Sequence, residues 1–350
     1  MENKYTISEI TDKNHWDNFV INSQTSSFLQ SWNWSEFQEK GLNKKIFRIG
    51  VFEKEDLVAT CLCLEEETKL GKFIYCPRGP MLNWEVNARE IINEILQYLK
   101  TKESYMFVRM DPSVRKDSQE ISNIFKSLNA KDAITFLQVE RCWMLDIENK
   151  SQEQLLSQMR IQTRYNINKC QRDGKVSVKI SDLNEIDQNT FIDMLTDMSK
   201  QKGFFTHPKK YFTDMFNFGK ENGMINIAIA YADNIPVASA IITILGNEAC
   251  YIYGASNKDD TKLRASYLLQ WEMIKYAMSK GVKKYNFWGV VSDQNYHEGY
   301  PGYGYSNFKK GFGGELIEYT RAKDFVFKIL QYQAYRLMEL YWKTFFRKGN

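Results

Sequence analysis

Residues 46–64 read IFRIGVFEKEDLVATCLCL, and residues 225–243 read INIAIAYADNIPVASAIIT. Each stretch is typical of a strand, a polar turn and a second strand, because apolar and β-branched residues alternate on both sides of a turn such as 233–234. The second strand opens with Val-Ala-Thr at 58–60 and with Val-Ala-Ser at 237–239. We therefore expect two antiparallel hairpins built to one pattern.

The segments that follow the two hairpins also correspond. Aromatic strand patterns at 72–76 and 249–253 are followed by apolar helical stripes at 91–99 and 267–278, and then by strand patterns at 105–108 and 285–288. Antiparallel strands followed by a helix and a further strand indicate an α/β or α+β plan. Found twice, this plan predicts two related domains with mixed sheets flanked by helices. The alternative is a chance likeness of two generic α/β segments.

Length and composition agree with a folded, two-domain protein. The chain has 350 residues, of which 43% are hydrophobic and 26% are charged. No signal peptide and no apolar run long enough for a membrane helix is evident, so we expect a cytoplasmic protein. The six cysteines form no C-x-x-C pair, and the three histidines match no zinc spacing. We expect reduced thiols and no metal site.

Three more helical patterns lie between and after the two copies. Residues 151–172 begin with Ser151 as an N-cap and Glu153 in the first turn. Residues 184–202 form the second pattern, and the aromatic-rich residues 323–346 form the third. We expect one continuous helix in each range.

The entry to each repeated helix bears on the acyl donor. Acetyltransferases of this plan bind the pyrophosphate of coenzyme A on backbone N–H groups at a helix start, which requires a glycine-rich turn. The second helix is entered by TKLRASY at 261–267 and the first by NWEVN at 83–87, and neither contains glycine. The plan therefore fits an acyltransferase whose donor is not coenzyme A.

Residues 296–314, YHEGYPGYGYSNFKKGFGG, combine glycines, tyrosines and two lysines. Because residues 316–319 continue as a strand and not as a helix, a nucleotide-binding loop is disfavoured. We expect a mobile aromatic loop that ends in a positioned lysine, Lys309 or Lys310. The alternative is a surface loop with solvated lysines.

Arg160, Arg164 and Arg172 recur at helical spacing within 151–172, which places them on one face of the expected helix. Such a stripe suits the phosphates of tRNA or of a nucleotide sugar. The alternative is a solvated face.

Asp111 lies at a strand end of the first domain, in the sequence RMDP at 109–112. A carboxylate there can orient an amine or accept a proton, or it can form an Asx-type turn before proline.

Four aromatic side chains could line a groove for an extended sugar–peptide, or they could belong to the core. They are Trp32, Trp34, Tyr211 and Tyr253.

Several short motifs stand in one order along the chain: FLQSWNW at 28–34, PRGP at 77–80, TRYNI at 163–167, FFTH at 204–207, YGAS at 253–256, YLLQWE at 267–272 and NFKKGFGG at 307–314. In these motifs the chain resembles the FemABX family of peptidoglycan interpeptide-bridge aminoacyltransferases, from about residue 28 to about residue 322. The resemblance is to the compact members, which have no coiled-coil arm.

The resemblance implies two acetyltransferase-like (GNAT-type) domains, 1–148 and 149–319, with residues 320–350 returning to the first domain and the substrate in a cleft between them. It implies aminoacyl-tRNA as the donor and no further cofactor. The acceptor would be an amine of the stem peptide, carried either by lipid II or by UDP-MurNAc-pentapeptide.

The resemblance also implies roles for single residues. Lys309 stands where the family's essential lysine follows a phenylalanine, and Asp111 stands near an aspartate of the cleft, so these two are the candidate catalytic residues. The candidate substrate-binding residues are Trp34, Gln38, Arg78, His207, Tyr211, Tyr253 and Phe308. Gln38 and His207 stand near positions where a compact relative has a lysine and an arginine, which leaves the carrier of the acceptor open.

The sequence thus predicts aminolysis of an aminoacyl ester, with Lys309 stabilising the oxyanion. An acyl-CoA-dependent N-acyltransferase is one alternative. A non-enzymatic RNA-binding or membrane-surface module is another, because the C-terminal helix with Phe345, Phe346, Arg347 and Lys348 could rest on the inner membrane surface. Packing of that helix on the first domain is the competing expectation.

Overall fold

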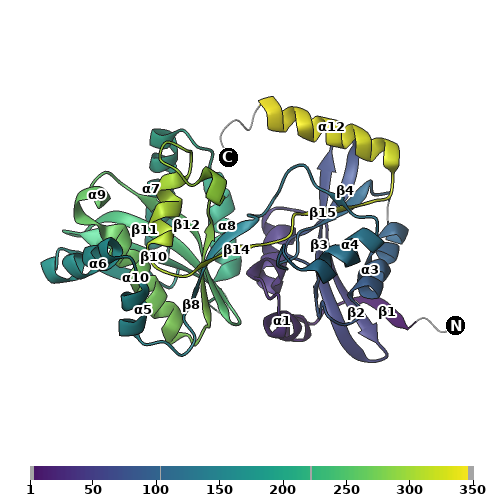
Figure 1. Ribbon diagram of the computed structural model, residues 1–350, viewed down its shortest axis with the longest axis horizontal. Helices are drawn as coiled ribbons and strands as arrows, with labels where there is room; N and C mark the ends of the chain where they lie inside the picture. Colours follow the sequence, from purple (N-terminus) through teal and green to yellow (C-terminus); the bar gives the residue numbers. More distant parts are fainter. Residues whose placement is uncertain (1–3, 103, 221–222, 346–350) are drawn as a thin grey trace. The chain divides into compact units, whose positions relative to one another are not determined.

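The computed structural model describes residues 4–102, 104–220 and 223–345 (Figure 1). The chain forms two compact units, one made of residues 1–140 and 318–350 and the other of residues 141–317. Each unit is built around its own mixed β-sheet. Among the described residues, no helix combines the length and the apolar composition that crossing a bilayer requires.

The first unit contains, in chain order, β1 (Tyr5–Glu9), α1 (Lys13–Asn22), η1 (Phe28–Gln30), α2 (Trp32–Glu36), η2 (Phe37–Gly41), β2 (Ile46–Glu53), β3 (Asp56–Thr68), β4 (Gly71–Cys76), β5 (Met81–Leu82), α3 (Ala88–Lys102), β6 (Phe107–Met110), α4 (Gln119–Ser127), β7 (Lys131–Asp132), β15 (Lys323–Val326) and α12 (Ile329–Phe345). Its strand order is β1-β2-β3-β4-β6-β15-β7, and β5 pairs with β3. β4 and β6 are parallel.

The second unit contains β8 (Arg141–Asp146), α5 (Gln152–Gln158), α6 (Ile161–Asp173), β9 (Val176–Ser181), α7 (Glu185–Lys202), α8 (Lys209–Gly219), β10 (Ile225–Ala232), β11 (Ile235–Leu245), β12 (Glu248–Ser256), α9 (Asp260–Leu263), α10 (Ala265–Ser279), β13 (Lys284–Gly289), η4 (Asp293–Asn295), α11 (Tyr303–Lys310) and β14 (Glu315–Glu318). Its strand order is β14-β8-β13-β12-β11-β10-β9. β12 and β13 are parallel.

The two predicted hairpins are present as β2–β3 and β10–β11. Asp233 and Asn234 both have positive φ, which matches the turn that two-residue hairpins favour. Each hairpin also carries a register shift shortly before the turn, between Val51 and Phe52 in one and between Ala230 and Tyr231 in the other. The repeat therefore extends to the irregularities of the strands.

Apolar periodicity explains how the helices cover the sheets. The predicted stripe of α3 is buried in the first core, together with alternate residues of β2. In the second unit, α10 and α6 pack on one side of the sheet around Trp271 and Ile167. α7 and α8 form a separate aromatic contact through Phe191, Phe212 and Phe216. α7 also packs on β10, β11 and β12.

Strand β8 shows where the sequence-based boundary at 148 differs from the structure. β8 is antiparallel to β13 and so belongs to the second sheet, whereas β15, from the C-terminal part of the chain, is antiparallel to β6 in the first sheet. In each sheet, one antiparallel strand lies beside the parallel pair: β15 beside β4 and β6, and β8 beside β12 and β13. β8 comes from the segment before the second repeat, and β15 from the segment after it, so the two repeats exchange these strands. Local sequence patterns do not reveal such an exchange, because both strands look like ordinary short strands.

The expected single helix over 323–346 is corrected to a strand, β15, followed by α12. Phe346, Arg347 and Lys348, named with this helix, lie outside the described residues, and the side chain of Phe345 does as well. The expectation that the helix packs on the first domain agrees with its contacts. The rings of Tyr332 and Tyr335 lie 5.2 and 5.0 Å from the ring of Phe107.

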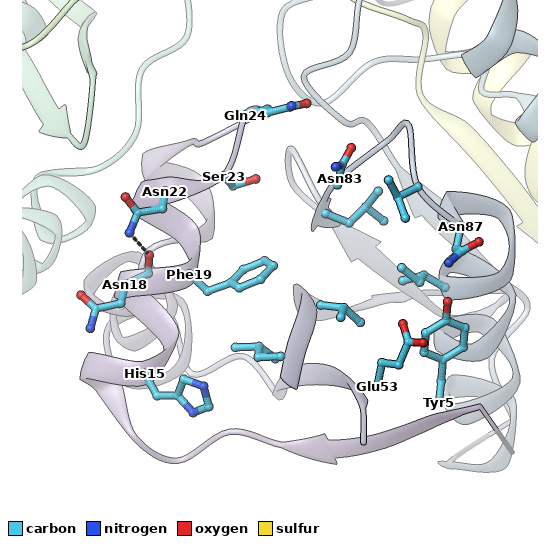
Figure 2. A pocket seen from close by; sticks show the side chains of 15 residues that line it. Tyr5, His15, Asn18, Phe19, Asn22, Ser23, Gln24, Glu53, Asn83 and Asn87 are labelled. Atoms are coloured by element: carbon cyan, nitrogen blue, oxygen red, sulfur yellow. Dashed lines mark hydrogen bonds between the residues drawn. The ribbon is translucent and has the colours of Figure 1, made fainter. Parts of the chain in front are cut away.

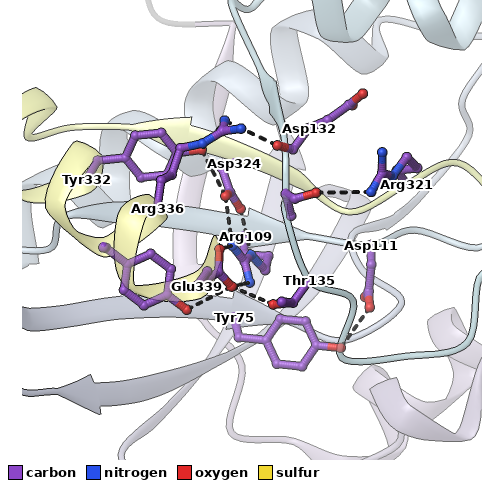
Figure 3. Close-up of polar contacts among 12 residues, drawn as sticks. Tyr75, Arg109, Asp111, Asp132, Thr135, Arg321, Asp324, Tyr332, Arg336 and Glu339 are labelled. Atoms are coloured by element: carbon purple, nitrogen blue, oxygen red, sulfur yellow. Dashed lines mark hydrogen bonds and ion pairs between the residues drawn. The ribbon is translucent and has the colours of Figure 1, made fainter. Parts of the chain in front are cut away.

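A buried ionic network ties β15 and α12 to the first sheet (Figure 3). Arg109 on β6 donates two hydrogen bonds to Asp324 at 2.7 and 2.8 Å and two to Glu339 at 2.9 and 3.1 Å. Burial opposes the charged guanidinium, but the hydrogen bonds to these carboxylates raise the pKa of Arg109 above its ordinary value. Tyr332 and Tyr335 donate further hydrogen bonds to the same carboxylates. Two carboxylates share one cation here, and every charge is paired.

Candidate functional site

The parallel strands of the second unit pair only at their beginnings. Residues 248–250 of β12 pair with residues 284–286 of β13, while β12 continues to Ser256. The register of β12 against β11 shifts between Ile241 and Ile242, which marks a bulge just beyond the paired part. The second halves of β12 and β13 therefore part, and side chains from other elements can enter between them.

Lys309 enters this opening from α11. Its ammonium donates a hydrogen bond to the carbonyl oxygen of Gly289, the last residue of β13, at 2.8 Å. The same nitrogen lies 5.5 Å from the ring of Tyr251 on β12 and 5.2 Å from that of Tyr305. The residue is only 9% exposed, and burial lowers the pKa of the Lys309 amine to about 7. Among the described residues no carboxylate forms an ion pair with it.

The segment around Lys309 is a helix and not the predicted loop, so that expectation is corrected. α11 begins after Gly302, whose φ of +90° glycine adopts without strain. Its buried Ser306 accepts a hydrogen bond from the backbone N–H of Val291, and Phe308 packs against Tyr267 and Phe312. These tertiary contacts stabilise a short helix that glycine-rich composition alone disfavours. The strand predicted to follow is present as β14.

A close backbone approach explains one glycine of this segment. Gly314 has a φ of +93°, and a Cβ atom there would lie 2.3 Å from the carbonyl oxygen of Met144 on β8. A side chain at this position would push β14 away from β8, its neighbour in the sheet. The glycine therefore helps to fix the place from which Lys309 reaches Gly289.

Lys310 has different surroundings from those of its neighbour. Its ammonium forms an ion pair with Asp293 at 3.1 Å and lies 3.9 Å from the ring centroid of Tyr296. The side chain is 8% exposed. The two adjacent lysines thus have separate environments: Lys310 pairs with a carboxylate, whereas Lys309 donates to a carbonyl oxygen.

The expected single helix over 151–172 is interrupted, which corrects the arginine stripe. α5 ends at Gln158 and α6 begins at Ile161, because the N–H of Arg160 donates to the carbonyl oxygen of Gly311 at 2.9 Å and holds the chain extended. Arg160 therefore precedes α6 and does not share a helical face with Arg164 and Arg172.

Each of the three arginines has its own setting. The guanidinium of Arg160 donates to Asn307 at 2.6 Å and to Tyr296 at 3.3 Å, next to Lys310. Arg164 donates to two carbonyl oxygens at the C-terminal end of α5. Arg172 is exposed in the last turn of α6. Only Arg160 lies beside α11, so a cationic group there consists of Arg160 and Lys310.

The structure brings together three predicted substrate-binding residues of the second unit. The rings of His207 and Tyr211 stack with their centroids 3.8 Å apart. Burial and a hydrogen bond with Tyr253 raise the pKa of Tyr211. The ring of Tyr211 covers one side of the His207 imidazole. Partial burial lowers the pKa of His207. Tyr253 lies on β12 two residues after Tyr251, which contacts Lys309.

Asp111 and Arg78 form a buried network at the strand ends of the first unit. One carboxylate oxygen of Asp111 accepts the backbone N–H of Arg78 at 2.7 Å. The other accepts the hydroxyl of Tyr75 at 2.8 Å (Figure 3). Burial raises the pKa of Asp111, although Arg78 acts against this. The guanidinium of Arg78 donates to Val139 and stacks on Tyr319. Both oxygens of Asp111 are thus engaged by protein donors.

The remaining predicted residues are enclosed by packing. Trp34 is 8% exposed, and its ring makes edge contacts with Phe28 and Phe37. Gln38 is buried in η2. Phe308 belongs to the margin of the second core. Sequence reasoning missed Gly289, Tyr251 and Tyr305 as contacts of Lys309; the two tyrosines stood in the quoted aromatic strand and loop, whereas nothing marked Gly289.

A cavity of about 760 Å³ opens in the first unit between α1 and the start of α3 (Figure 2). Phe19 from α1 and Leu82 from β5 contribute to its apolar floor. Its polar lining is rich in carboxamides: Asn18, Asn22, Gln24, Asn83 and Asn87. Glu53 is the acid of the lining, and no lysine or arginine belongs to it. This chemistry suits an uncharged polar group more than a phosphate.

Three cysteines of the first unit meet in space although their spacing matched no known pattern. Cys61, Cys63 and Cys76 have sulfur atoms within 4.8 Å of one another. Alternation along β3 places the first two on one face, and Cys76 ends the neighbouring strand. All three are fully buried within the core that α3 covers. Their thiols serve there as small apolar groups.

Comparison with known proteins was made for the whole chain. A model of the FemAB family matches residues 10–234 and 228–340. The aminoacyltransferase FemA of Staphylococcus epidermidis is 22% identical to this chain. The alignment covers 81% of this chain and 87% of that FemA. FemA of Staphylococcus aureus is 21% identical over 76% of this chain and 82% of its own length.

Solved structures share the fold. A crystal structure of FemX superposes with a TM-score of 0.85 at 19% identity, covering 95% of this chain and 100% of FemX. A tandem GNAT protein from the clavulanic acid biosynthesis pathway superposes with a TM-score of 0.56 at 7% identity, covering 91% and 98%. The predicted fold class, two tandem acetyltransferase-like domains with mixed sheets, is confirmed.

Proposed function

This chain belongs to the FemAB family, and we propose that it transfers an aminoacyl group from aminoacyl-tRNA to an amine of the stem peptide of a peptidoglycan precursor. The chain is an aminoacyltransferase, as its FemA relatives are named. It acts in the cytoplasm. The observation that carries the reaction is the ammonium of Lys309, which lies in the opening between β12 and β13 with no carboxylate paired to it among the described residues.

The reaction is aminolysis of an ester. The acceptor nitrogen attacks the aminoacyl carbonyl carbon and forms the new C–N bond. The C–O bond to the ribose of the tRNA breaks, and the proton lost by the amine ends on the ribose oxygen. Negative charge grows on the carbonyl oxygen only during the attack, so a cation fixed beside it stabilises the transition state more than the ground state.

Lys309 has the donors that this role requires. An ammonium carries three N–H groups, and the hydrogen bond to Gly289 uses one of them. A pKa of about 7 means that the protonated form, which the role needs, is still present at neutral pH. Because the site is buried, each remaining donor acts in a low dielectric.

The other residues have supporting parts in this proposal. His207, Tyr211 and Tyr253 contact the acceptor, and Asp111 with Arg78 stabilises the strand ends of the first unit. Arg160 and Lys310 beside α11 meet phosphates, whereas Arg164 and Arg172 contribute only at longer range. Trp34, Gln38 and Phe308 support these groups from within the packed protein. Lipid II and UDP-MurNAc-pentapeptide both remain candidate acceptors.

The test is a transfer assay with total tRNA charged with labelled amino acids one at a time, and with both acceptors in parallel. We expect label to reach a precursor only when charged tRNA is present. Acetyl-CoA should neither bind in calorimetric titration nor support transfer, because neither α3 nor α10 begins with a glycine turn. Micromolar binding of acetyl-CoA with transfer of its acetyl group would replace this proposal by the acyl-CoA alternative.

A further inference from the structure

α12 has two faces of opposite character. Tyr332, Tyr335 and Glu339 are buried and recur at spacings of three and four, so they form the face that packs on the first unit. The rings of Phe73 and Phe107 lie against the two tyrosines. This inward face explains why the helix is held in place.

The opposite face is apolar and exposed. Leu330, Leu337 and Tyr341 recur at spacings of seven and four and are 82%, 68% and 55% exposed. The whole set, which we call the α12 apolar face, is Ile329, Leu330, Leu337, Leu340 and Tyr341. Contiguous apolar surface of this kind marks a site of contact with a partner or a membrane.

A neighbouring segment of the first unit also exposes apolar side chains. Thr135 donates a hydrogen bond to Glu339 of α12, and the next two residues, Phe136 and Leu137, are 41% and 46% exposed. The loop thus adds exposed apolar side chains to the first unit beside the inward face of α12.

Basic residues outnumber unpaired carboxylates around the α12 apolar face, because the exposed Asp132 beside Arg336 is paired with Lys323. Glu339 is the acidic residue of the helix, and it is buried in the network with Arg109. The basic residues within the helix, Arg336 and Lys343, lie at one edge of the apolar stripe by helical spacing, and Lys328 comes just before the helix. An apolar stripe with cations along one edge complements a lipid surface that has anionic headgroups over an apolar interior.

We propose that the α12 apolar face docks on the surface of an anionic lipid bilayer, with the helix lying in the interface. A helix of 17 residues with a packed polar side does not cross a membrane, but it can sink one face to the level of the headgroups. Tyr341 near its end is a residue type that favours that level. Resting on the proposed function, one consequence follows: the acceptor is the lipid-linked precursor, which the docked enzyme meets at the same surface.

The experiment measures flotation of the full-length protein with vesicles of phosphatidylglycerol and phosphatidylcholine, and with vesicles of phosphatidylcholine alone. The test variant is Leu330→Ser/Leu337→Ser/Tyr341→Ser, which leaves the inward face intact. The matched control is Ile186→Ser/Phe205→Ser, which removes exposed apolar side chains of the second unit (77% and 104% exposed). A second variant, Lys328→Gln/Lys343→Gln, removes flanking charge.

We expect the wild-type protein and the control to bind the anionic vesicles, and the triple variant to partition at least about tenfold less, because three apolar contacts are lost. The lysine variant should bind more weakly, and the difference should shrink at high salt. Unchanged thermal melting of the triple variant shows that it is folded.

Three results would overturn the inference: a wild-type protein that stays unbound, a triple variant that binds as well as the wild type, or a wild-type dimer that the triple substitution dissociates without vesicle binding. The last result would make a second copy of the chain the occupant. Transfer to lipid II in vesicles should fall in the triple variant. Absence of transfer by the wild type to either acceptor would count against the proposed function and leave the vesicle result standing.

Discussion

The two units share one strand order but differ in what lies at the ends of their parallel strands. In the second unit the opening between β12 and β13 contains an amine, Lys309, with one hydrogen bond to Gly289. In the first unit, Asp111 at the end of β6 has both carboxylate oxygens engaged by Tyr75 and Arg78. An ammonium with donors to spare can act on a substrate, whereas a carboxylate with its oxygens engaged serves the protein itself. We therefore propose that the repeat supplies one reactive end, at Lys309, and one structural end, at Asp111.

The two exchanged strands, β15 and β8, also differ in the contacts that hold them in their sheets. β15 is fixed in the first sheet by the buried ion pair of Asp324 with Arg109. β8 enters the second sheet through backbone pairing with β13 and through apolar side chains such as Leu145. A buried charge depends on its partner far more than an apolar contact does. A single substitution in this ion pair should therefore destabilise the first unit more than a single substitution in β8 destabilises the second.

The largest effect is expected from Arg109→Met. It leaves Asp324 and Glu339 buried without their cation, which typically costs about 3–5 kcal/mol of unfolding free energy. Hydrogen exchange followed by mass spectrometry should show faster exchange in β6, β15 and α12 and little change in β10–β12. The control is Lys200→Met, whose pairing with Asp197 is exposed and contributes little.

A rescue variant sharpens this prediction. Arg109→Met/Asp324→Leu/Glu339→Met replaces the whole ionic network by apolar groups and should recover much of the lost stability. If the triple variant is no more stable than Arg109→Met, lost packing and not an unpaired charge is the cause. Equal loss of protection in both units would contradict the distinction between the two exchanged strands.

The next effect is expected on turnover. Lys309→Met keeps most of the stem and removes the charge, and loss of one oxyanion donor typically lowers kcat by about a hundredfold or more. Binding of the precursor should change much less. Lys310→Met is the matched control: its partners are Asp293 and Tyr296, so it should affect affinity more than kcat. Near-normal kcat in both variants would exclude the role given to Lys309, and a parallel loss of affinity would make it a ground-state contact.

The features that sequence predicted are those that local periodicity encodes. Hairpins and helical stripes repeat within a few residues, so β10–β11 and α3 were both anticipated. The break before α6 was not, because it depends on a hydrogen bond from Arg160 to Gly311, far along the chain. α11 was missed for the same reason, since its stability comes from contacts of Ser306 and Phe308. Lys309 was named through family motifs, but its carbonyl partner had no sequence signal.

A smaller effect is expected from Asp111→Ala, which tests the structural end. The change leaves the hydroxyl of Tyr75 and the N–H of Arg78 without an acceptor in a buried place, at a cost of about 1–3 kcal/mol in unfolding free energy. Measured well below the melting temperature, kcat should fall only severalfold. A hundredfold loss of kcat with unchanged stability would instead make Asp111 a catalytic group and remove the contrast between the two units.

The last effect concerns pH, and it has opposite signs for stability and for activity. The pKa of Lys309 is lowered from 10.5 to about 7 by burial, so between these values the unfolded chain binds more protons than the folded one. Unfolding free energy should therefore rise with pH across this window, by at most about 1.4 kcal/mol per pH unit, relative to Lys309→Met. Turnover should fall over the same window, because the oxyanion loses its cation as the amine deprotonates. Lys309→Arg, whose guanidinium stays charged, should flatten the fall in turnover even if its kcat at neutral pH is lower. Denaturant titrations and pH–rate profiles of the three proteins measure both trends.

The contrary outcome is a turnover that rises from pH 7 to pH 9 in the wild type and rises equally in Lys309→Arg. That result would show that deprotonation of another group limits the reaction and that the charge of Lys309 does not.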